Sequence, residues 1–372
     1  MRIDYVITGL GIGGAEIQAV TLLERLIKRG HQVRLISLTP SVALKLKERL
    51  VAANIPLYSL NMRSALQLPV ALWRLRCLLK QFSPDVVHAH MVHANILARL
   101  VRLLLPKTKL ITTAHNIYEG GRLRDWAYRL TDSLSQLNTT ISAAATHRFT
   151  RENIFSREKT LTLFNGIDLE KFRPPKPCQK SQAPFRWLAV GRLAEQKDYP
   201  VLLQALAQLT TSHLAIAGKG SLLGMLQKQS QCLGLSQRIN FLGVRDDIEK
   251  LMQQVDGFVL SSKFEGYGLV VAEAMAAELP VVVTDSGGPA EIVGHDGAAG
   301  KLVPIQDPQA LAQAMAEIEA LSPIARREMG QQARQRIQEK FNIDQIVTQW
   351  EQVYTSLIKN RRFDVSEFTG AT

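Results

Sequence analysis

The feature that most constrains the fold is a regular alternation of short apolar runs with helix-forming segments. In the first half of the 372-residue chain, the strand-like runs are residues 3–8, 33–38, 86–89, 109–113, 138–142 and 160–164. In the second half they are residues 185–190, 213–217, 239–242, 257–260, 281–284 and 301–303. Strands that alternate with helices in this way predict βα units and parallel sheets.

A proline-rich segment separates the two series. Residues 173–177 contain three prolines, which is typical of a linker, and a single core rarely extends beyond about 250–300 residues. We therefore expect an α/β chain with two Rossmann-like domains that face each other across a cleft, at residues 1–172 and 173–344. The sequence predicts helices from about Asp307 to Lys359. Ligands of such sheets bind beyond the carboxyl ends of the strands.

Two carboxylates, Glu265 and Glu273, stand eight positions apart around a Gly-x-Gly turn between an apolar strand and a helix. The N–H groups of Gly268, Leu269 and Val270 would be free at the start of that helix, where they favour a phosphate. Sugar and ribose hydroxyls donate well to carboxylates. The stretch therefore fits a nucleoside diphosphate with a sugar at each end, or else an ordinary strand–turn–helix with two solvated acids.

Gly9, Gly11 and Gly14 form a G-x-G-x-x-G pattern between a strand and a helix, as in dinucleotide-binding proteins. That fingerprint also requires an acid at the end of the second strand, about 20 residues further on. Residues 37–40 contain no acid there, so NAD is disfavoured. The loop can still cradle a phosphate or approach a substrate, or it can be a tight packing turn.

Two cations, Arg192 and Lys197, follow the first strand of the second series. They can clamp a diphosphate, and the guanidinium can do so with two parallel hydrogen bonds. A solvated charged loop is the alternative. Because parallel strands end at one edge of a sheet, we expect both cations on the same rim as Glu265.

Histidines occur at the ends of two strands in the first series. His115 ends one strand and should face the cleft, where it could donate to a sugar hydroxyl, although a core histidine fits equally well. His88 and His90 fall on one face of another strand by alternation. No acid or thiol accompanies them, so we expect no metal site.

Composition narrows the class of protein. The content of 46% hydrophobic and 21% charged residues is typical of an ordinary globular protein. Cys77, Cys178 and Cys232 show no metal or disulfide spacing, which indicates a reducing compartment. Residues 1–172 hold 24 Lys and Arg against 12 Asp and Glu, whereas residues 173–372 hold 21 of each. The whole net charge of +12 thus lies in the first half and suggests an anionic surface or acceptor there.

At these residues the sequence resembles the family-4 retaining glycosyltransferases of the GT-B fold, over nearly the whole chain. The matching motifs are Gly13-Gly14-Ala15-Glu16, Thr113-Ala114-His115-Asn116, Asn165-Gly166-Ile167-Asp168 with Phe172, Gly191-Arg192-Leu193 with Lys197, Ala217-Gly218-Lys219-Gly220, the E-x7-E element from Glu265 to Glu273, and Ser286-Gly287-Gly288-Pro289-Ala290-Glu291-Ile292-Val293. One departure is Glu278, at a place where the family usually has glycine before x-Pro. If Glu278 is left-handed, a strain of roughly 1 kcal/mol is expected there.

The resemblance implies roles in the second domain. Arg192 and Lys197 would clamp the diphosphate, Glu265 would hold the donor sugar, and Glu273 would bind the ribose. The backbone donors around the phosphates and sugar would be Gly268, Leu269 and Val270. The donor would be a nucleotide-sugar, UDP-linked in preference to GDP-linked, and no metal or other cofactor would be needed.

In the first domain, the resemblance makes Gly14 the loop glycine over the diphosphate and His115 the residue near the reacting centre. It also implies that residues 345–372 comprise a helix that crosses back to the first domain and a mobile tail. A front-face displacement is the mechanism usually proposed for the family, in which the leaving phosphate helps to deprotonate the acceptor.

The acceptor implied by the resemblance is a glycan or lipid-linked sugar in cell-surface polysaccharide or lipopolysaccharide assembly. Basic, apolar segments around Trp73, Arg99 and Trp126 can lie on an anionic membrane, or they can be domain helices with one solvated face. We expect a cytoplasmic protein, peripheral on the membrane, that binds no nucleic acid, because no aromatic-basic binding motif occurs.

Other functions remain open at this point. A GT-B sugar-nucleotide epimerase or phosphorylase would share the fold, and an NAD(P)-dependent oxidoreductase would use Gly9 to Gly14 as its cofactor loop. A non-catalytic nucleotide-sugar-binding protein is a further possibility. A hydrolase that uses the two acids is disfavoured, because that chemistry needs carboxylates on opposing sides of the bond.

Overall fold

The computed structural model describes residues 1–11, 13–174 and 184–360, and the chain in it divides into two compact units. Unit 1 contains Met1–Gly166 and the described residues from Ile343 onward, and unit 2 is Ile167–Asn342. The expected linker from residue 175 on, Cys178 and the C-terminal tail from residue 361 lie outside the described residues. Cys77 and Cys232 are free thiols.

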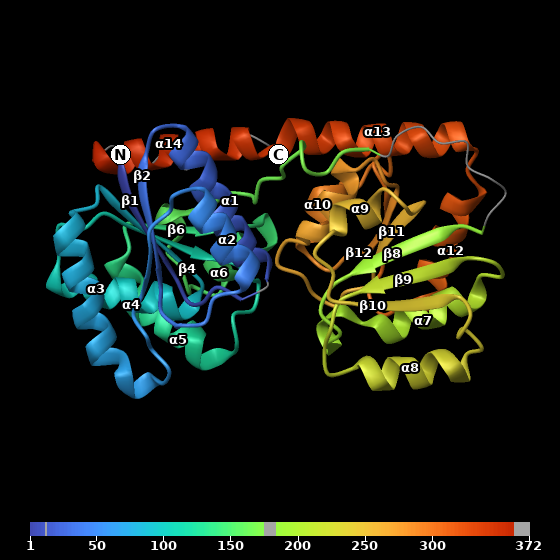
Figure 1. Ribbon diagram of the computed structural model, residues 1–372, viewed down its shortest axis with the longest axis horizontal. Coiled ribbons are helices and arrows are strands. Elements are labelled where there is room, and N and C mark those ends of the chain that lie inside the picture. Colours follow the sequence, from blue (N-terminus) through green and yellow to red (C-terminus); the bar gives the residue numbers. More distant parts are fainter. Residues whose placement is uncertain (12, 175–183, 361–372) are drawn as a thin grey trace. The chain divides into compact units, whose positions relative to one another are not determined.

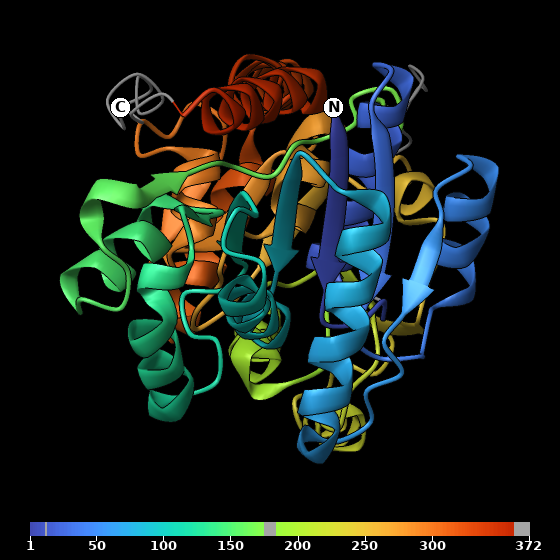
Figure 2. The ribbon, with the colours of Figure 1, turned by 90° about the vertical axis from the view of Figure 1, so that its left-hand side faces the viewer.

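Unit 1 is built on a seven-stranded parallel sheet with the order β3-β2-β1-β4-β5-β6-β7. Its strands are β1 (Arg2–Ile7), β2 (Gln32–Ser37), β3 (Leu57–Ser59), β4 (Val86–His90), β5 (Leu110–Ala114), β6 (Leu137–Thr140) and β7 (Thr160–Thr162). Most of these residues are buried, because helices cover both faces of the sheet (Figure 2). This strand order is that of a Rossmann fold, extended by β7.

The helices of unit 1 form two layers. They are α1 (Gly14–Lys28), α2 (Leu44–Ala52), α3 (Leu68–Phe82), α4 (Val92–Leu104), α5 (Arg122–Thr131), α6 (Ala143–Arg151) and α14 (Ile343–Ile358). The first core joins β1 and β2 to α1, α2 and α14, and the second joins α3 and α4 to the other face of the sheet. A third core holds Tyr128 of α5 against α6.

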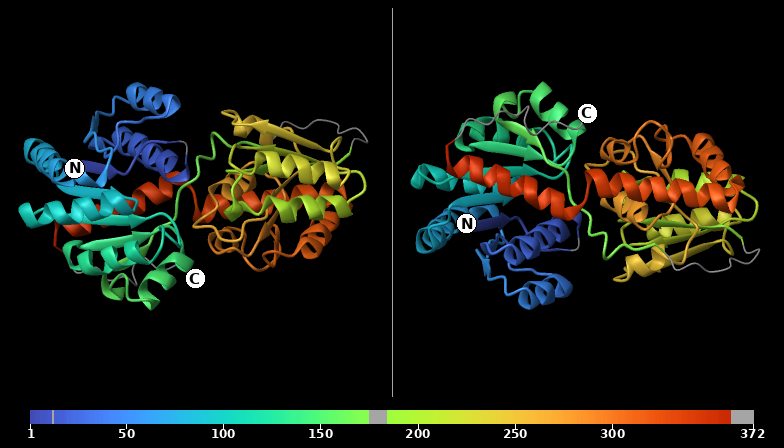
Figure 3. Two further views of the ribbon diagram at one scale, coloured as in Figure 1. Left: turned by 90° about the horizontal axis from the view of Figure 1, so that it is seen from below. Right: turned by 90° about the horizontal axis from the view of Figure 1, so that it is seen from above.

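Helix α14 confirms the expectation that the C-terminal helix returns to the first domain. Its Val347, Trp350 and Val353 belong to the same core as β1, although more than 300 residues separate them in the sequence (Figures 1 and 3). The Tyr354 hydroxyl lies 2.7 Å from that of Tyr5 and 2.8 Å from His88 Nδ1.

Unit 2 repeats the plan with a six-stranded parallel sheet in the order β10-β9-β8-β11-β12-β13. The strands are β8 (Arg186–Val190), β9 (His213–Ala217), β10 (Ile239–Gly243), β11 (Gly257–Leu260), β12 (Val281–Thr284) and β13 (Lys301–Val303). The helices are α7 (Tyr199–Gln208), α8 (Leu223–Cys232), α9 (Ile248–Met252), α10 (Leu269–Ala276), α11 (Gly288–Val293), α12 (Pro308–Ala320) and α13 (Pro323–Lys340). The two Rossmann-like sheets confirm the predicted fold class.

No helix in the described ranges is both long and apolar enough to cross a membrane.

Glu278 is left-handed, with φ of 58°, so the condition for the expected strain is met. The N–H of Glu278 donates to Met275 at 3.0 Å, and the N–H of Leu279 donates to Ala274 at 3.0 Å, so the turn closes the helix end. A side chain at Gly330 of α13 would overlap the Glu278 carbonyl oxygen. Glycine at position 330 therefore allows α13 to approach the end of α10.

Candidate functional site

Two loops of unit 2 meet at the carboxyl ends of β8 and β11, which are neighbours in the sheet. The N–H of Lys263 donates to the Gln196 carbonyl at 2.8 Å, and the Gln196 amide donates to the Phe264 carbonyl at 3.0 Å. The Ser261 hydroxyl donates to the Lys197 carbonyl at 2.9 Å. These bonds fix the two loops together, so the sequence-predicted residues on them share one rim.

Lys197 and Glu265 form the centre of this rim. Lys197 Nζ donates to Glu265 Oε2 at 2.6 Å, and each side chain is only 14% exposed. The Ser262 hydroxyl donates to the same carboxylate oxygen at 3.2 Å. The structure thus brings together two residues that are 68 positions apart in the sequence, with one carboxylate oxygen held by two donors.

A third loop supports the backbone of Glu265. The N–H of Glu265 donates to the Ser286 carbonyl at 2.8 Å, and the N–H of Gly288 donates to the Glu265 carbonyl at 3.1 Å. The result is a parallel bridge between Glu265 and Gly287. The motif that contains Gly287 and Gly288 therefore has a structural partner in the E-x7-E loop.

Helix α10 begins immediately after Gly268, which has φ of 89° and caps the helix in a left-handed conformation. The Gly268 carbonyl accepts the first bond of the helix from Val271 at 2.8 Å. Among the described residues, the N–H groups of Gly268, Leu269 and Val270 donate no backbone hydrogen bond. Such a helix start can bind an anion.

Glu273 lies one turn into α10 and is half-buried. Its carboxylate makes no hydrogen bond with any residue that the structure describes. Burial raises the pKa of the Glu273 carboxyl to about 7, Lys171 lowers it, and the nearby acid Glu249 raises it further. An acid that is desolvated without a hydrogen-bond partner is suited to accept hydroxyl donors from a ligand.

Arg192 is exposed at the tip of the loop after β8, and no side-chain bond joins it to residues 1–11, 13–174 or 184–360. The backbone beneath it is fixed, because the N–H of Leu193 donates to the Lys219 carbonyl at 3.0 Å. A side chain at Gly218 would overlap the Gly191 carbonyl oxygen. Glycine there lets the loop after β9 support the loop that carries Arg192.

Gly14 is the exposed first residue of α1 in unit 1. The glycine-rich loop before it contains residue 12, which lies outside the described residues. Gly13 is extended, with φ of −149° and ψ of 165°, and caps the helix without a side-chain hydrogen bond. Gly14 therefore presents bare backbone at a helix start.

His115 is buried at the carboxyl end of β5. Its Nε2 lies 2.9 Å from His90 Nδ1, and its backbone N–H donates to Glu119 Oε1 at 2.7 Å. Burial lowers the pKa of His115 to about 4, so its imidazole is neutral at pH 7. His115 Nδ1 and His90 Nε2 have no partner within the described ranges. Both rings line a cavity of about 20 Å³, which is enough for one water molecule.

The sequence interpretation considered His90 only as a metal ligand and did not single out Met91. Met91 has φ of 72° and ψ of 153°, a conformation that costs on the order of 1–3 kcal/mol outside glycine. Its N–H donates to the Thr113 carbonyl at 3.1 Å, which fixes the turn between His90 and α4. The alternation of His88 and His90 did predict their shared face, and their rings lie 4.0 Å apart. Nothing in the sequence marks Met91.

Comparison with known families gives two matches along the chain. The family described as Glycosyltransferase Family 4 matches residues 12–171, and the family described as Glycosyl transferases group 1 matches residues 175–336. Together they span most of both units.

Curated relatives extend over most of the chain. N-acetyl-alpha-D-glucosaminyl L-malate synthase of Bacillus anthracis is 25% identical over 370 residues, which cover 94% of this chain and 95% of that protein. The putative glycosyltransferase EpsD of Bacillus subtilis is 28% identical over 283 residues, which cover 70% and 74%. The O-antigen biosynthesis glycosyltransferase WbnH of Escherichia coli is 31% identical over 236 residues, which cover 61% and 66%.

Solved structures share the fold. Alr3699/HepE of Anabaena, in complex with UDP, superposes with a TM-score of 0.83 at 22% identity, over 96% of this chain and 100% of that one. A glycosyltransferase from Rickettsia africae gives a TM-score of 0.84 at 19% identity, over 96% and 99%.

Proposed function

The chain belongs to the group 1 and family 4 glycosyltransferases and has their GT-B fold, and we propose that it transfers a sugar from a UDP-sugar to a glycan or lipid-linked acceptor with retention of configuration. The observation that carries this proposal is the rim of unit 2. There Lys197 and Glu265 are paired at 2.6 Å, beside the free N–H groups at the start of α10. The cation of Lys197 would bind the diphosphate, and the acid of Glu265 would bind the sugar. The free N–H groups at the start of α10 would bind a phosphate oxygen.

The diphosphate would lie between Arg192, Lys197 and the start of α10. Arg192 is exposed and without a partner among the described residues, so it can bind a ligand without losing an existing ion pair. Arg, Lys and backbone N–H groups stabilise the negative charge that develops on a leaving diphosphate. This assignment needs no metal ion for that purpose.

Glu273 would accept hydrogen bonds from the ribose hydroxyls. Its carboxylate is half-buried, has no hydrogen-bond partner within the described part of the chain, and lies one turn beyond the N–H groups proposed for the phosphates. Two ribose hydroxyls would satisfy an acid that burial otherwise disfavours in its charged form.

Glu265 would hold the donor sugar, and His115 would act in unit 1 as a neutral hydrogen-bonding group. In the proposed displacement, the bond between the sugar C1 and the diphosphate oxygen breaks while a bond from C1 to the acceptor oxygen forms on the same face. The acceptor's hydroxyl proton passes to the leaving phosphate. Gly14 would allow the backbone of unit 1 to approach that phosphate.

UDP is proposed as the nucleotide because structures of the Anabaena protein were obtained with UDP and with UDP-glucose. A GDP-sugar is the second candidate. Relatives named for O-antigen and lipopolysaccharide core biosynthesis support a glycan or lipid-linked acceptor in cell-surface assembly. With a lipid-linked acceptor, the enzyme would work as a peripheral protein on the cytoplasmic face of the membrane.

The nucleotide is tested by thermal shifts with UDP, GDP, ADP, dTDP and NAD, because a ligand that binds only the folded state raises its stability. We expect a shift with UDP and none with NAD. A shift with NAD alone would support the oxidoreductase and contradict the proposal.

The reaction itself is tested with a UDP-sugar and candidate acceptors. Glu265→Ala should abolish transfer while leaving UDP binding. Epimerisation of the free UDP-sugar, without transfer, would instead identify the epimerase alternative within the same fold.

A further inference from the structure

Helix α5 of unit 1 exposes an apolar stripe. Leu123, Trp126 and Leu130 are 87%, 55% and 74% exposed. Their spacing of three and four residues places them on one side of the helix. The opposite side is fixed by Tyr128, which is fully buried and donates to Glu119 at 2.5 Å. The stripe therefore faces away from the core that Tyr128 fills.

Helix α4, beside α5, and helix α3, on the far side of α4, also expose apolar residues. α4 packs between α3 and α5 in one layer over the sheet (Figure 1). α3 exposes Val70 and Trp73, and the end of α4 exposes Leu103 and Leu104. We call these exposed residues of α3, α4 and α5 the apolar face. Singly exposed apolar residues are ordinary, but a cluster of them across adjacent helices indicates an interaction surface.

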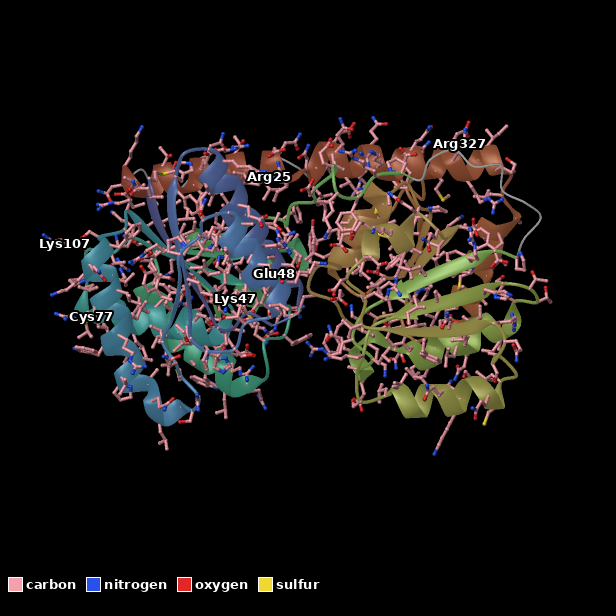
Figure 4. The ribbon with its side chains drawn as sticks, viewed as in Figure 1. Arg25, Lys47, Glu48, Cys77, Lys107 and Arg327 are labelled. Carbon is pink, nitrogen blue, oxygen red and sulfur yellow. The ribbon has the colours of Figure 1, made fainter. Side chains whose placement is uncertain are left out.

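The charges around the apolar face are mainly positive. Arg122 is exposed with no side-chain partner among the described residues, and Arg129 lies with its guanidinium carbon 5.1 Å from the centre of the Trp126 ring. Lys107, in the loop after α4, points outward (Figure 4). The acid on α5, Asp125, is paired with Arg148 at 2.5 Å. The free charge around this surface therefore favours an anionic partner.

A basic hollow lies beyond the C-terminal end of α5. It has a volume of about 540 Å³, and its lining includes Arg129, Arg151 and Arg157. Its acid, Asp132, is paired with Lys159 at 3.1 Å. Arg129 already donates to the Asn153 carbonyl at 3.0 Å and to the Glu152 carbonyl at 2.6 Å. Arg151 and Arg157 are exposed, and their guanidinium forks suit the oxygens of a phosphate group that lies next to the apolar stripe.

The structure also corrects part of the sequence interpretation. Arg99 belongs to a segment that the sequence left as either membrane-facing or a domain helix with one solvated face, but its side chain is fully buried. It donates to Thr112 at 3.0 Å and to Asn138 at 2.7 Å, so it serves the interior of unit 1. Arg102 is likewise bound to the carbonyls of Thr108 and Leu134. The C-terminal half of α4 therefore contributes leucines, and not these arginines, to the surface.

We propose that the apolar face docks on an anionic lipid bilayer, with Trp73, Trp126 and the leucines at the level of the headgroups and the arginines on lipid phosphates. Helices that lie in a membrane interface are typically rich in tryptophan and leucine, with arginines beside them. The helices of βα units run antiparallel to the strands, so the N-terminal ends of α3 and α5 lie at the sheet edge where His115 ends β5. The inference rests on the proposed lipid-linked acceptor, which such docking would bring to that edge.

The test uses vesicles of phosphatidylglycerol and phosphatidylethanolamine, with phosphatidylcholine vesicles for comparison. The full chain should sediment with the anionic vesicles. The triple variant Leu123→Ser, Trp126→Ser, Leu130→Ser should bind them at least tenfold more weakly, whereas Ile324→Ser should bind as the wild type does. Ile324 is a comparably exposed apolar residue on α13 of unit 2.

Lipids brominated in their acyl chains give a second readout. They should quench the fluorescence of Trp73 and Trp126, which are exposed, and leave that of Trp187 and Trp350, which are buried. Absence of vesicle binding, equal binding by the triple variant, or no quenching would each overturn the proposal.

UDP thermal shifts on the same proteins separate this proposal from the proposed function. A triple variant that retains its UDP shift but loses the vesicles supports the docking surface. A wild type that binds vesicles but shows no UDP shift contradicts the proposed function and leaves the docking surface supported.

Discussion

Lys197 Nζ and Glu265 Oε2 lie 2.6 Å apart and join the loop after β8 to the loop after β11. This ion pair fixes the cation proposed for the diphosphate next to the acid proposed for the donor sugar. Both side chains are largely shielded from solvent, so their attraction is less screened than that of a surface pair. Replacing one of these two side chains should therefore disturb the position of the other.

Glu265→Gln retains the size of the side chain and removes its negative charge. We expect kcat to fall by about 100-fold or more, a typical effect of losing a charge-stabilising group at a reacting centre. UDP affinity should remain within about threefold of the wild type, because Lys197 and Arg192 stay in place. Steady-state kinetics and titration calorimetry measure the two quantities. Glu195→Gln, at an exposed acid in the neighbouring loop after β8, is the matched control. Full activity of Glu265→Gln would contradict the assigned role.

Glu273 should make UDP binding pH-dependent. Because its pKa is raised to about 7, roughly half of these carboxyls are protonated at pH 7. Ribose hydroxyls favour the charged form, so binding should strengthen as pH rises from 6 to 8 and release about half a proton at pH 7.

Calorimetry of UDP binding at pH 7, in buffers with different ionisation enthalpies, measures that proton. Glu273→Gln cannot titrate and should show no such release. A wild type and a Glu273→Gln variant with identical pH profiles would exclude Glu273 as the ribose ligand.

Buried histidines should make unit 1 sensitive to acid. Burial lowers the pKa of His115 to about 4, while the unfolded chain keeps a value near 6.5. The unfolded state therefore binds more protons between these values, so the stability is complete above pH 6.5 and is lost as pH falls towards 4. For His115 alone, the free energy of unfolding should fall by about 2 kcal/mol between pH 7 and pH 5. His88 and His90, whose pKa values burial also lowers, should add to the effect.

Denaturant unfolding at pH 7 and pH 5 measures this dependence. His115→Gln should lose part of it, whereas His147→Gln, at an exposed position on α6, should keep it. An unchanged pH dependence in His115→Gln would show that His115 titrates normally in the folded protein.

The contact between Glu278 and Gly330 predicts two changes of opposite sign. Glu278→Gly relieves a left-handed non-glycine residue and should raise the free energy of unfolding by about 0.5–1 kcal/mol. Gly330→Ala places a methyl group against the Glu278 carbonyl and should lower it by roughly 1–3 kcal/mol.

Thermal melting of the two variants measures the signs. Gly224→Ala on α8 is the control, because nothing lies within 4 Å of the added methyl group. Its melting temperature should not fall. A Gly330→Ala variant as stable as wild type would mean that α13 can move away from α10 without cost.

The alternation of apolar runs predicted the parallel sheets well, because a buried parallel strand needs a continuous apolar run. The strands at His213–Ala217, Gly257–Leu260, Val281–Thr284 and Lys301–Val303 have the predicted bounds. β3 was not predicted, because Leu57–Ser59 is a three-residue edge strand with little buried apolar surface. A short edge strand is held in place by hydrogen bonds to the neighbouring strand, and its own sequence has too few apolar residues to predict it.

The site was predictable only in part. The rule that ligands bind at the carboxyl ends of strands placed Arg192, Lys197 and Glu265 on one rim. Their spacing could not predict that Lys197 would bond directly to Glu265, because that contact depends on the conformation of two loops. Arg99 shows the same limit, since its partners Thr112 and Asn138 lie on other elements and turned an expected surface cation into a buried one.

In the proposed function, unit 2 holds a nucleoside diphosphate through the cations of its rim. Titration calorimetry measures UDP binding to the wild type, to Arg192→Ala and to the control Arg327→Ala, whose arginine lies on α13 (Figure 4). We predict that Arg192→Ala weakens binding by about 10- to 100-fold, as the loss of charge-assisted hydrogen bonds requires, and that Arg327→Ala binds as wild type. Equal UDP affinity in all three proteins, or no UDP binding by the wild type, would show that the rim of unit 2 does not bind the diphosphate in this way.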